Sequence, residues 1–159
     1  GGHAMAAGFK LERRKEDDVL AMLGERLAVP VAAATATRPL AIDGALSSGA
    51  ANVELMELLE RVGPYGAGHP EPRFVFPAHR LSRVRIVNDE HVRCTLIAAS
   101  GARLEAAAFR VGDTPLAKLL RNGEGRPLHL AGHLRRDNWN GRDGVELIVE
   151  DAAEAARSR

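Results

Sequence analysis

The chain has 159 residues, of which 45% are hydrophobic and 4% aromatic, and its formal net charge is +1. This length allows one domain or two small ones, with a core built from Leu, Val and Ala. The small net charge excludes a uniformly basic nucleic-acid-binding protein, so any such surface must come from local clustering. The single cysteine, Cys94, excludes an internal disulfide. With no membrane-length apolar run and no visible signal peptide, we expect a soluble, cytoplasmic protein without a membrane partner.

Two helices are predicted in the first 62 residues. Residues 15–28 place apolar side chains at helical spacing behind an acidic first turn. Residues 53–62 carry a second amphipathic pattern, with Ser48 or Asn52 as its N-cap.

Extended segments alternate with these helices. Residues 9–12 and 37–43 are typical of short strands. Residues 1–62 are few for an independent core, so we expect them to be the end of a larger α/β domain.

A joint rich in glycine and proline follows, with the sequence GPYGAGHPEP at residues 63–72. Prolines fix φ and restrict the residues that precede them, so this joint is expected to be stiff. After it the apolar period changes from that of helices to that of strands.

Five short runs beyond the joint alternate apolar and polar residues, and one helical stretch separates the third run from the fourth. This is the element order of an OB-fold barrel. We therefore predict an α+β chain, with a five-stranded OB-fold domain at residues 63–152 and a helical or frayed tail at 153–159. Alternation places two sets of apolar side chains inside the barrel: Val92, Cys94, Leu96 and Ala98, then Leu128, Leu130 and Leu134.

Basic residues cluster in the predicted barrel. Between His79 and Arg136 there are eleven Lys/Arg against five Asp/Glu, and ten of the eleven are Arg. Arginine suits bidentate phosphate contacts and stacking on bases. A strip that binds a single strand is one interpretation, and a solvated barrel exterior is the other. The candidate residues are Arg83 and Arg85 on one strand face, Arg93 on the neighbouring strand, and Arg135 and Arg136.

Trp139 and Tyr65, the only residues of their types, lie in the turn NWNG and in the joint. Each is placed to stack on a base or to pack against the protein. His129 and His133 have the spacing of a helical metal pair, but in a strand they lie about 13 Å apart, too far for one ion. We expect no metal site and no complete catalytic site in this chain.

The opening GGH at Gly1, Gly2 and His3 is a weak candidate phosphate site, because the glycines let backbone N–H groups approach an anion and the imidazole adds a contact. Residues 4–8 are expected to begin a helix whose N-terminus favours phosphate.

Three segments together resemble the RecJ family of single-stranded-DNA-specific 5′→3′ exonucleases, in the DHH phosphoesterase superfamily. The opening GGHAMAAGF is similar to the Gly-Gly-His motif of the DHH-associated domain. The joint is similar to the family's Gly-Pro-Phe-Gly-x-Gly-Asn-Pro-Glu-Pro, with Tyr65 for Phe and His69 for Asn. The segment from His133 to Asp151 is similar to the family's last OB hairpin, with its Asn-x-Trp-x-Gly turn.

The resemblance implies the C-terminal part of a nuclease that acts in DNA repair and recombination. Residues 1–62 would be the end of the DHH-associated domain, and the joint would anchor the OB domain to it. The family's metal-binding motifs lie in an upstream DHH catalytic domain, which in the parent hydrolase uses manganese or magnesium. This chain would bind single-stranded DNA without cutting it, and Gly1, Gly2 and His3 would hold a substrate phosphate.

Two other hypotheses remain open from the residues. The chain is a stand-alone OB nucleic-acid-binding module, or its barrel is a docking surface for a single-strand-binding or repair protein. Charge reversal at Arg83, Arg85 and Arg93 separates DNA binding from docking.

Overall fold

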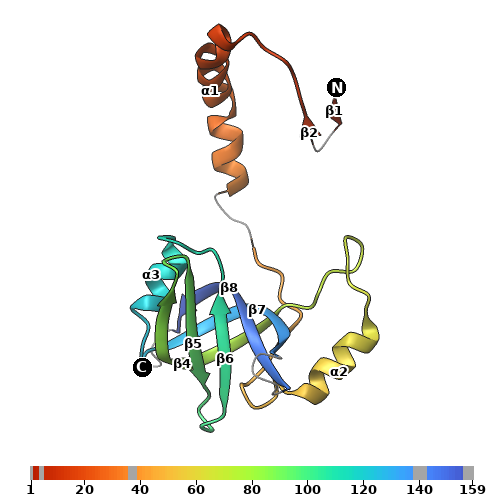
Figure 1. Cartoon of the computed structure of the whole chain (residues 1–159), viewed down its shortest axis with the longest axis vertical. Coiled ribbons are helices and arrows are strands. Elements are labelled where there is room, and N and C mark those ends of the chain that lie inside the picture. The colour runs from red at the N-terminus through yellow and green to blue at the C-terminus, as the bar shows by residue number, and fades with distance from the viewer. Residues whose placement is uncertain (1, 4–5, 36–38, 138–142, 156–159) are drawn as a thin grey trace. The chain divides into compact units, whose positions relative to one another are not determined.

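The computed structural model describes residues 2–3, 6–35, 39–137 and 143–155. The chain divides into two compact units, Gly1–Leu40 and Ala41–Arg159, which are described separately (Figure 1).

The first unit is a short antiparallel strand pair followed by a long helix. Strand β1 (Gly2–His3) pairs with β2 (Ala6–Ala7). After a 3-10 turn at Arg13–Lys15, helix α1 runs over Glu16–Thr35 and begins with three acidic residues, which favour a helix N-terminus.

The predicted helix over residues 15–28 is confirmed in type and is longer than expected, because it continues through Pro30. The strand expected at 9–12 is wrong, and so is the helix expected after GGH, since Ala6–Ala7 pair with Gly2–His3 instead. No side chain described over residues 8–32 is buried, so this part of the chain forms no core of its own.

The second unit is a closed barrel with two helices. Its elements are β3 (Gly44–Ala45), α2 (Val53–Val62), β4 (Phe74–Val87), β5 (His91–Ile97), β6 (Arg103–Ala108), α3 (Pro115–Arg121), β7 (Pro127–Asp137) and β8 (Gly144–Glu154). The sheet order is β3-β4-β5-β6-β8-β7, and β4 also pairs with β7, which closes the barrel. The predicted five OB strands, with a helix between the third and fourth, are therefore confirmed.

The core lies inside this barrel and contains the predicted apolar faces. The side chains expected to point inward from β5 and β7 are buried, and Phe76, Leu120 and Leu147 join them. Cys94 is among them. Burial, followed by the charge of Glu105, raises the pKa of its thiol to about 12, so this cysteine remains a thiol at neutral pH.

The segment before α2 differs from the prediction. Of the strand expected at 37–43, the structure describes residues 39–43 and they are not in a strand. The backbone N–H of Arg73 donates to an Asp43 carboxylate oxygen at 2.8 Å, and the Arg73 guanidinium donates to the Ala41 carbonyl at 3.1 Å. The Asp43 N–H also donates to the Arg73 carbonyl at 2.8 Å, but only Gly44–Ala45 form a strand that pairs with β4.

The C-terminal tail also differs, because β8 continues to Glu154, opposite Leu128 in β7. Residues 153 and 154 of the predicted tail are therefore strand and not helix or frayed chain, while residues 156–159 lie outside the described residues.

Helix α2 packs on the barrel. Asn52 caps it by accepting from the Leu55 N–H at 2.9 Å, whereas Ser48 donates its backbone N–H to Nε2 of the buried His79 at 3.1 Å. Met56 of α2 is part of the barrel core. Residues 41–62 thus lie in the same compact unit as the barrel, while the predicted family domain border between residues 62 and 63 stays a prediction.

Neither α1, α2 nor α3, as described, has the length and apolar character that a membrane-crossing helix requires.

Candidate nucleic-acid interface

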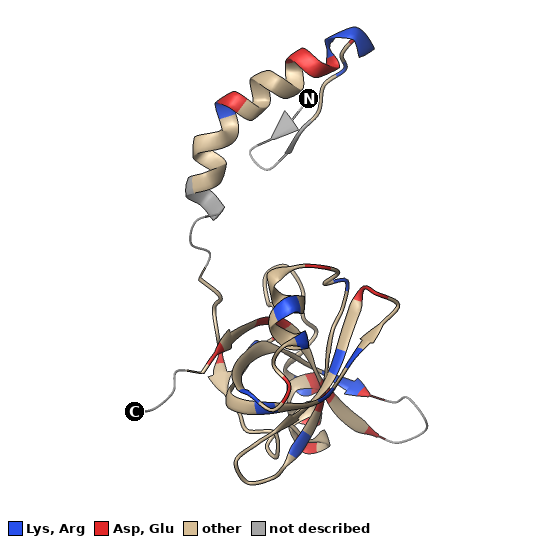
Figure 2. Ribbon diagram, turned by 90° about the vertical axis from the view of Figure 1, so that its left-hand side faces the viewer, with Lys and Arg blue, Asp and Glu red and all other residues tan. Residues whose placement is uncertain are grey.

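Basic and acidic positions lie close to one another over the barrel strands (Figure 2). The local excess of arginine is therefore not a continuous basic stripe. Whether an arginine of this region is free to bind a phosphate depends on whether its guanidinium already has a carboxylate partner.

Arg83 and Arg85 lie in β4 and both are exposed. Arg83 has a φ of 54° at a register shift between Ser82 and Arg85, and its backbone N–H donates to Glu124 at 3.0 Å. This bulge interrupts the alternation from which a shared face was predicted. Arg85 lies directly opposite Arg93 in β5. Neither the Arg83 nor the Arg85 guanidinium has an ion-pair partner in the described part of the chain.

Arg93 and Arg135 instead converge on one carboxylate. Glu146 in β8 has a side chain only 3% exposed, and it contacts Nη2 of Arg93 at 3.3 Å and Nε of Arg135 at 3.1 Å. Nη2 of Arg135 also donates to this carboxylate. A buried carboxylate needs such partners, so the two arginines are held in place by β8 between their own strands.

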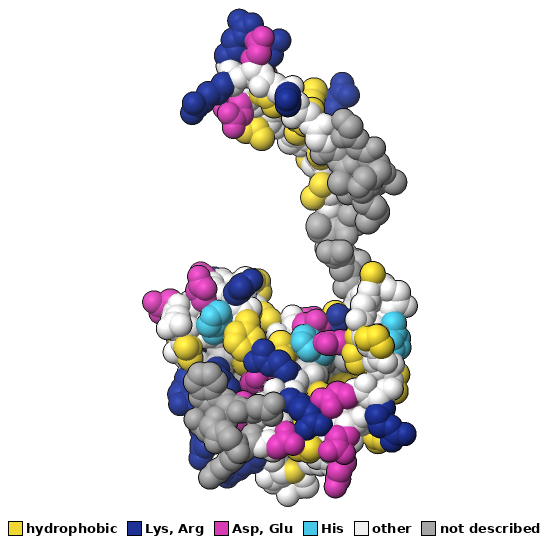
Figure 3. Space-filling view, turned by 45° about the vertical axis from the view of Figure 1, so that its right-hand side comes forward, with side chains coloured by type: hydrophobic (Ala, Val, Ile, Leu, Met, Phe, Trp, Pro, Cys, Tyr) yellow, Lys and Arg dark blue, Asp and Glu magenta, His cyan; other side chains and the backbone are white. Residues whose placement is uncertain are grey.

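An aromatic side chain lies beside this cluster. Phe109, directly after β6, is 40% exposed, and the guanidinium carbon of Arg135 lies 5.1 Å from its ring centroid. The His91 ring is 5.3 Å away at 64°, and its Nδ1 accepts from the Arg110 N–H at 2.9 Å. The face of the barrel in Figure 3 shows hydrophobic, His and Lys/Arg side chains next to one another.

Glu146 and Phe109 were not among the predicted site residues. By alternation along the chain, Phe109 falls on the same outward face as Arg103 and Glu105, and Glu146 falls on the same face as Ile148. For Phe109 this parity was a usable signal, because it places an aromatic ring on the outer face. For Glu146, parity alone predicts exposure, and only the neighbouring arginines bury it.

Arg136 has a different role from Arg135. It donates to Glu60 of α2 at 2.6 and 3.1 Å and to Asp143 at 2.9 and 3.0 Å. The hydrogen bonds to Glu60 and Asp143 raise the pKa of the Arg136 guanidinium, and the bond to Arg136 lowers the pKa of Glu60. Arg136 therefore holds α2 against β7, and all three of its guanidinium nitrogens donate to carboxylates.

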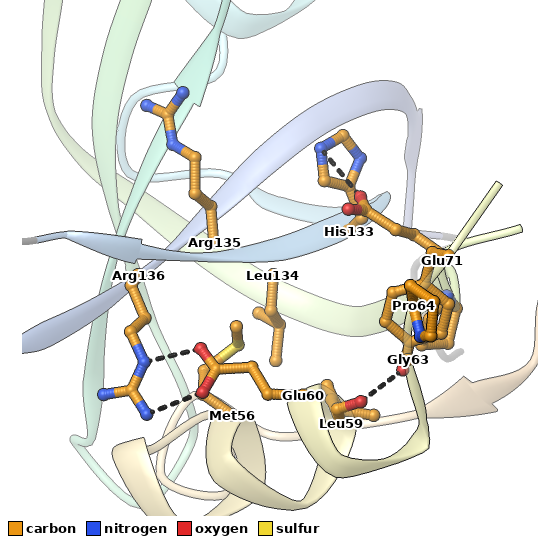
Figure 4. A pocket seen from close by; sticks show the side chains of 12 residues that line it. Met56, Leu59, Glu60, Gly63, Pro64, Glu71, His133, Leu134, Arg135 and Arg136 are labelled. Atoms are coloured by element: carbon orange, nitrogen blue, oxygen red, sulfur yellow. Dashed lines mark hydrogen bonds and ion pairs between the residues drawn. The ribbon is translucent and has the colours of Figure 1, made fainter.

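A cavity of about 330 Å³ lies between α2, the joint and β7. Figure 4 shows Leu134 and Arg136 pointing from β7 toward α2, whereas Arg135 points to the other side of the strand. The predicted pair Arg135 and Arg136 is thus divided between the outer face of the barrel and the packing of α2.

Tyr65 is part of the joint and is half-buried. Its hydroxyl donates to the Leu59 carbonyl near the end of α2 at 2.6 Å, and its ring lies 5.0 Å from that of His69. Of the two roles considered for Tyr65, this geometry favours packing against the protein.

We expect Tyr65→Phe to lower the free energy of unfolding by about 1 kcal/mol, because it removes one hydrogen bond and keeps the ring. The measurement is a urea unfolding curve of the variant beside the wild type. A loss several times larger would contradict this interpretation, since it would mean that the hydroxyl supports more than the Leu59 carbonyl.

Two predicted site elements lie wholly or partly outside the described residues. Trp139 and its turn are not described, and neither is Gly1. Gly2 and His3 are described only as the backbone of β1, so the phosphate site remains a prediction.

His129 and His133 contact different parts of the protein. Nδ1 of His129 accepts from the Ala78 N–H at 3.2 Å, while His133 lies 3.8 Å from Glu71 and 3.6 Å from Glu150. Within the described residues, no three His, Cys, Asp or Glu side chains are grouped so that they could hold a metal ion. Manganese or magnesium therefore has no fitting ligand set there.

Comparison with known proteins identifies the barrel. The family described as RecJ OB domain matches residues 42–151, which is most of the chain. The chain belongs to the RecJ OB domain family. Its relatives include the single-stranded-DNA-specific exonucleases RecJ of Salmonella typhimurium, 31% identical over 152 residues, and of Escherichia coli, 32% identical over 153 residues. Each alignment covers 95% of this chain but 26% of the relative, so the chain spans about a quarter of their length.

A solved RecJ structure shares the fold. The crystal structure of RecJ in complex with Mn²⁺ from Thermus thermophilus matches 84% of this chain with a TM-score of 0.55 and 22% identity, and the match covers 19% of that protein. At this identity the likeness supports the RecJ OB fold of the chain.

Proposed function

We propose that the Ala41–Arg159 unit binds single-stranded DNA along the outer face of its barrel. The support comes from membership of the RecJ OB domain family and from the arrangement of charged side chains on β4, β5, β7 and β8. OB folds commonly bind oligonucleotides on the face of their second and third strands, which are β5 and β6 here.

The observation that carries the proposal is the placement of Arg85 directly opposite Arg93. Like charges opposite one another on a sheet destabilise it. Glu146 compensates the charge of Arg93, and its described ion-pair partners are Arg93 and Arg135, not Arg85. The Arg85 guanidinium therefore lies beside a like charge without a carboxylate partner of its own. Such a group is suited to bind an anion such as a DNA phosphate.

We also propose that this DNA-binding unit serves a RecJ-type 5′→3′ exonuclease in DNA repair and recombination. Residues 1–62 would then be the end of a DHH-associated domain, in which Gly1, Gly2 and His3 hold a substrate phosphate. The cleavage chemistry, with manganese or magnesium, is assigned to a DHH domain outside this chain. A single strand held by the barrel would be directed toward that domain.

The test is fluorescence anisotropy of a labelled 5′-phosphorylated single strand and of a matched duplex, each titrated with the 159-residue chain at several salt concentrations. We expect preferential binding of the single strand, with an affinity that falls steeply as salt rises. A folded chain that binds neither DNA at low salt would contradict the proposal and favour a protein-docking barrel.

A further inference from the structure

Arg83, Arg85, Arg93 and Arg135 fall into two classes by their partners. Arg93 and Arg135 contact the buried carboxylate of Glu146, so part of their charge is already neutralised. Arg83 and Arg85 are exposed and form no ion pair with any described residue. Only an arginine of the second class can neutralise a phosphate without competing with a protein carboxylate.

Arg135, an arginine of the first class, holds Phe109 in an exposed position. The Arg135 guanidinium lies over its ring at 5.1 Å, and His91 approaches it at 5.3 Å in an edge-to-face arrangement. Arg135 is in turn fixed by Glu146 through Nε at 3.1 Å. A large aromatic ring that stays 40% exposed beside a rigid barrel forms a stacking surface at small entropic cost.

We propose that Phe109 and Arg135 form a nucleobase-stacking site, and that Arg83 and Arg85 bind the phosphates of the same strand. This division rests on the proposed DNA binding and adds to it which residues contact bases. The stacking site and Arg85 are connected through Arg93. Arg85 lies opposite Arg93 in the sheet, and Arg93 and Arg135 both bind Glu146.

The two kinds of site have different salt dependences. Each phosphate neutralised on a single strand contributes about 0.7 to the slope of log affinity against log salt, because counterions are released. Stacking on a ring releases no counterions and leaves the slope unchanged. Base stacking on an aromatic side chain contributes about 1 to 3 kcal/mol per base, which is about a 5- to 150-fold effect on affinity.

The variants are Phe109→Leu, Phe109→Trp and, as the charge comparison, Arg85→Ala, all in the 159-residue chain. Leu keeps an apolar side chain at a partly exposed position, and unfolding curves confirm that each variant is folded. We expect Phe109→Leu to weaken binding of a labelled single strand about 5-fold or more with the wild-type salt slope. Phe109→Trp should keep the wild-type affinity. Arg85→Ala should lower the slope of log affinity against log salt by about 0.7.

A scan of single abasic positions along the oligonucleotide provides a second readout. In the wild type, one abasic position should weaken binding more than its neighbours do, and Phe109→Leu should remove that difference. If the wild type binds but Phe109→Leu keeps its affinity, or changes the slope as Arg85→Ala does, the stacking site is wrong and DNA binding stands. If the folded wild type does not bind the strand, both proposals are overturned.

Discussion

Replacing Gly132 with alanine is expected to lower the free energy of unfolding by about 4 kcal/mol or more, the range reached when a substitution disrupts a packed core. Gly132 lies in β7 where the register with β8 shifts, and it also pairs with Phe74 of β4. A Cβ added there would be 1.9 Å from the Ile148 carbonyl oxygen and 2.8 Å from its carbon. Both are backbone atoms, so no side chain can move aside to relieve the clash.

The closed barrel leaves neither β7 nor β8 free to move away from the added methyl group. Moving β8 away from Gly132 strains the β7–β8 ladder, and moving β7 strains the β4–β7 pairing that closes the sheet. Domains of this size are stable by about 5 to 15 kcal/mol, so the variant would lose a large fraction of its stability.

Urea unfolding followed by circular dichroism measures this loss. Gly68→Ala is the matched control, because a Cβ at Gly68 in the joint would meet nothing within 4 Å. That variant should unfold close to the wild type. A Gly132→Ala protein within about 1 kcal/mol of the wild type would show that β7 and β8 are not held as closely as the structure has them.

The barrel was predictable from the sequence because its signals are local and repeated. Alternation along β5 and β7 identified Val92 and Leu130 as core residues, and both are completely buried. Asn52 at the start of α2 is also a local signal, since capping depends on residues three positions apart.

The failures of prediction have non-local causes. The segment before α2 was expected to be a strand, but Arg73, thirty positions beyond Asp43, binds it by other contacts. Glu146 is buried because arginines from β5 and β7 cover it, which no pattern within β8 records. These pairings depend on barrel closure, and closure brings together residues far apart in sequence.

The division between Arg135 and Arg136 was available from the alternation. Neighbouring residues in a strand point to opposite faces, so alternation already predicts that Arg135 and Arg136 face different surroundings. The structure places Arg135 beside Glu146 and Arg136 beside Glu60. We therefore expect the arginines outside ion pairs to dominate phosphate binding.

Reversing the charge of Arg83 and Arg85 together should weaken binding of single-stranded DNA by at least about 10²-fold, since two charge-assisted contacts of about 1.5 kcal/mol each are removed. The slope of log affinity against log salt should fall by about 1.4 for the two lost phosphate contacts. Arg93 is left unchanged in this variant, because a glutamate there would face the buried carboxylate of Glu146 and endanger folding.

The control has the same change in net charge at other exposed positions of the barrel unit, Arg61 in α2 and Arg126 beside Glu154. Losing the Arg126 ion pair costs little, because exposed pairs contribute about 0 to 1 kcal/mol. If only the Arg83 and Arg85 reversal abolishes binding, the effect is local to these two positions of β4. If both double variants lose affinity equally, binding depends on net charge alone, and the assignment of phosphate contacts to β4 is wrong.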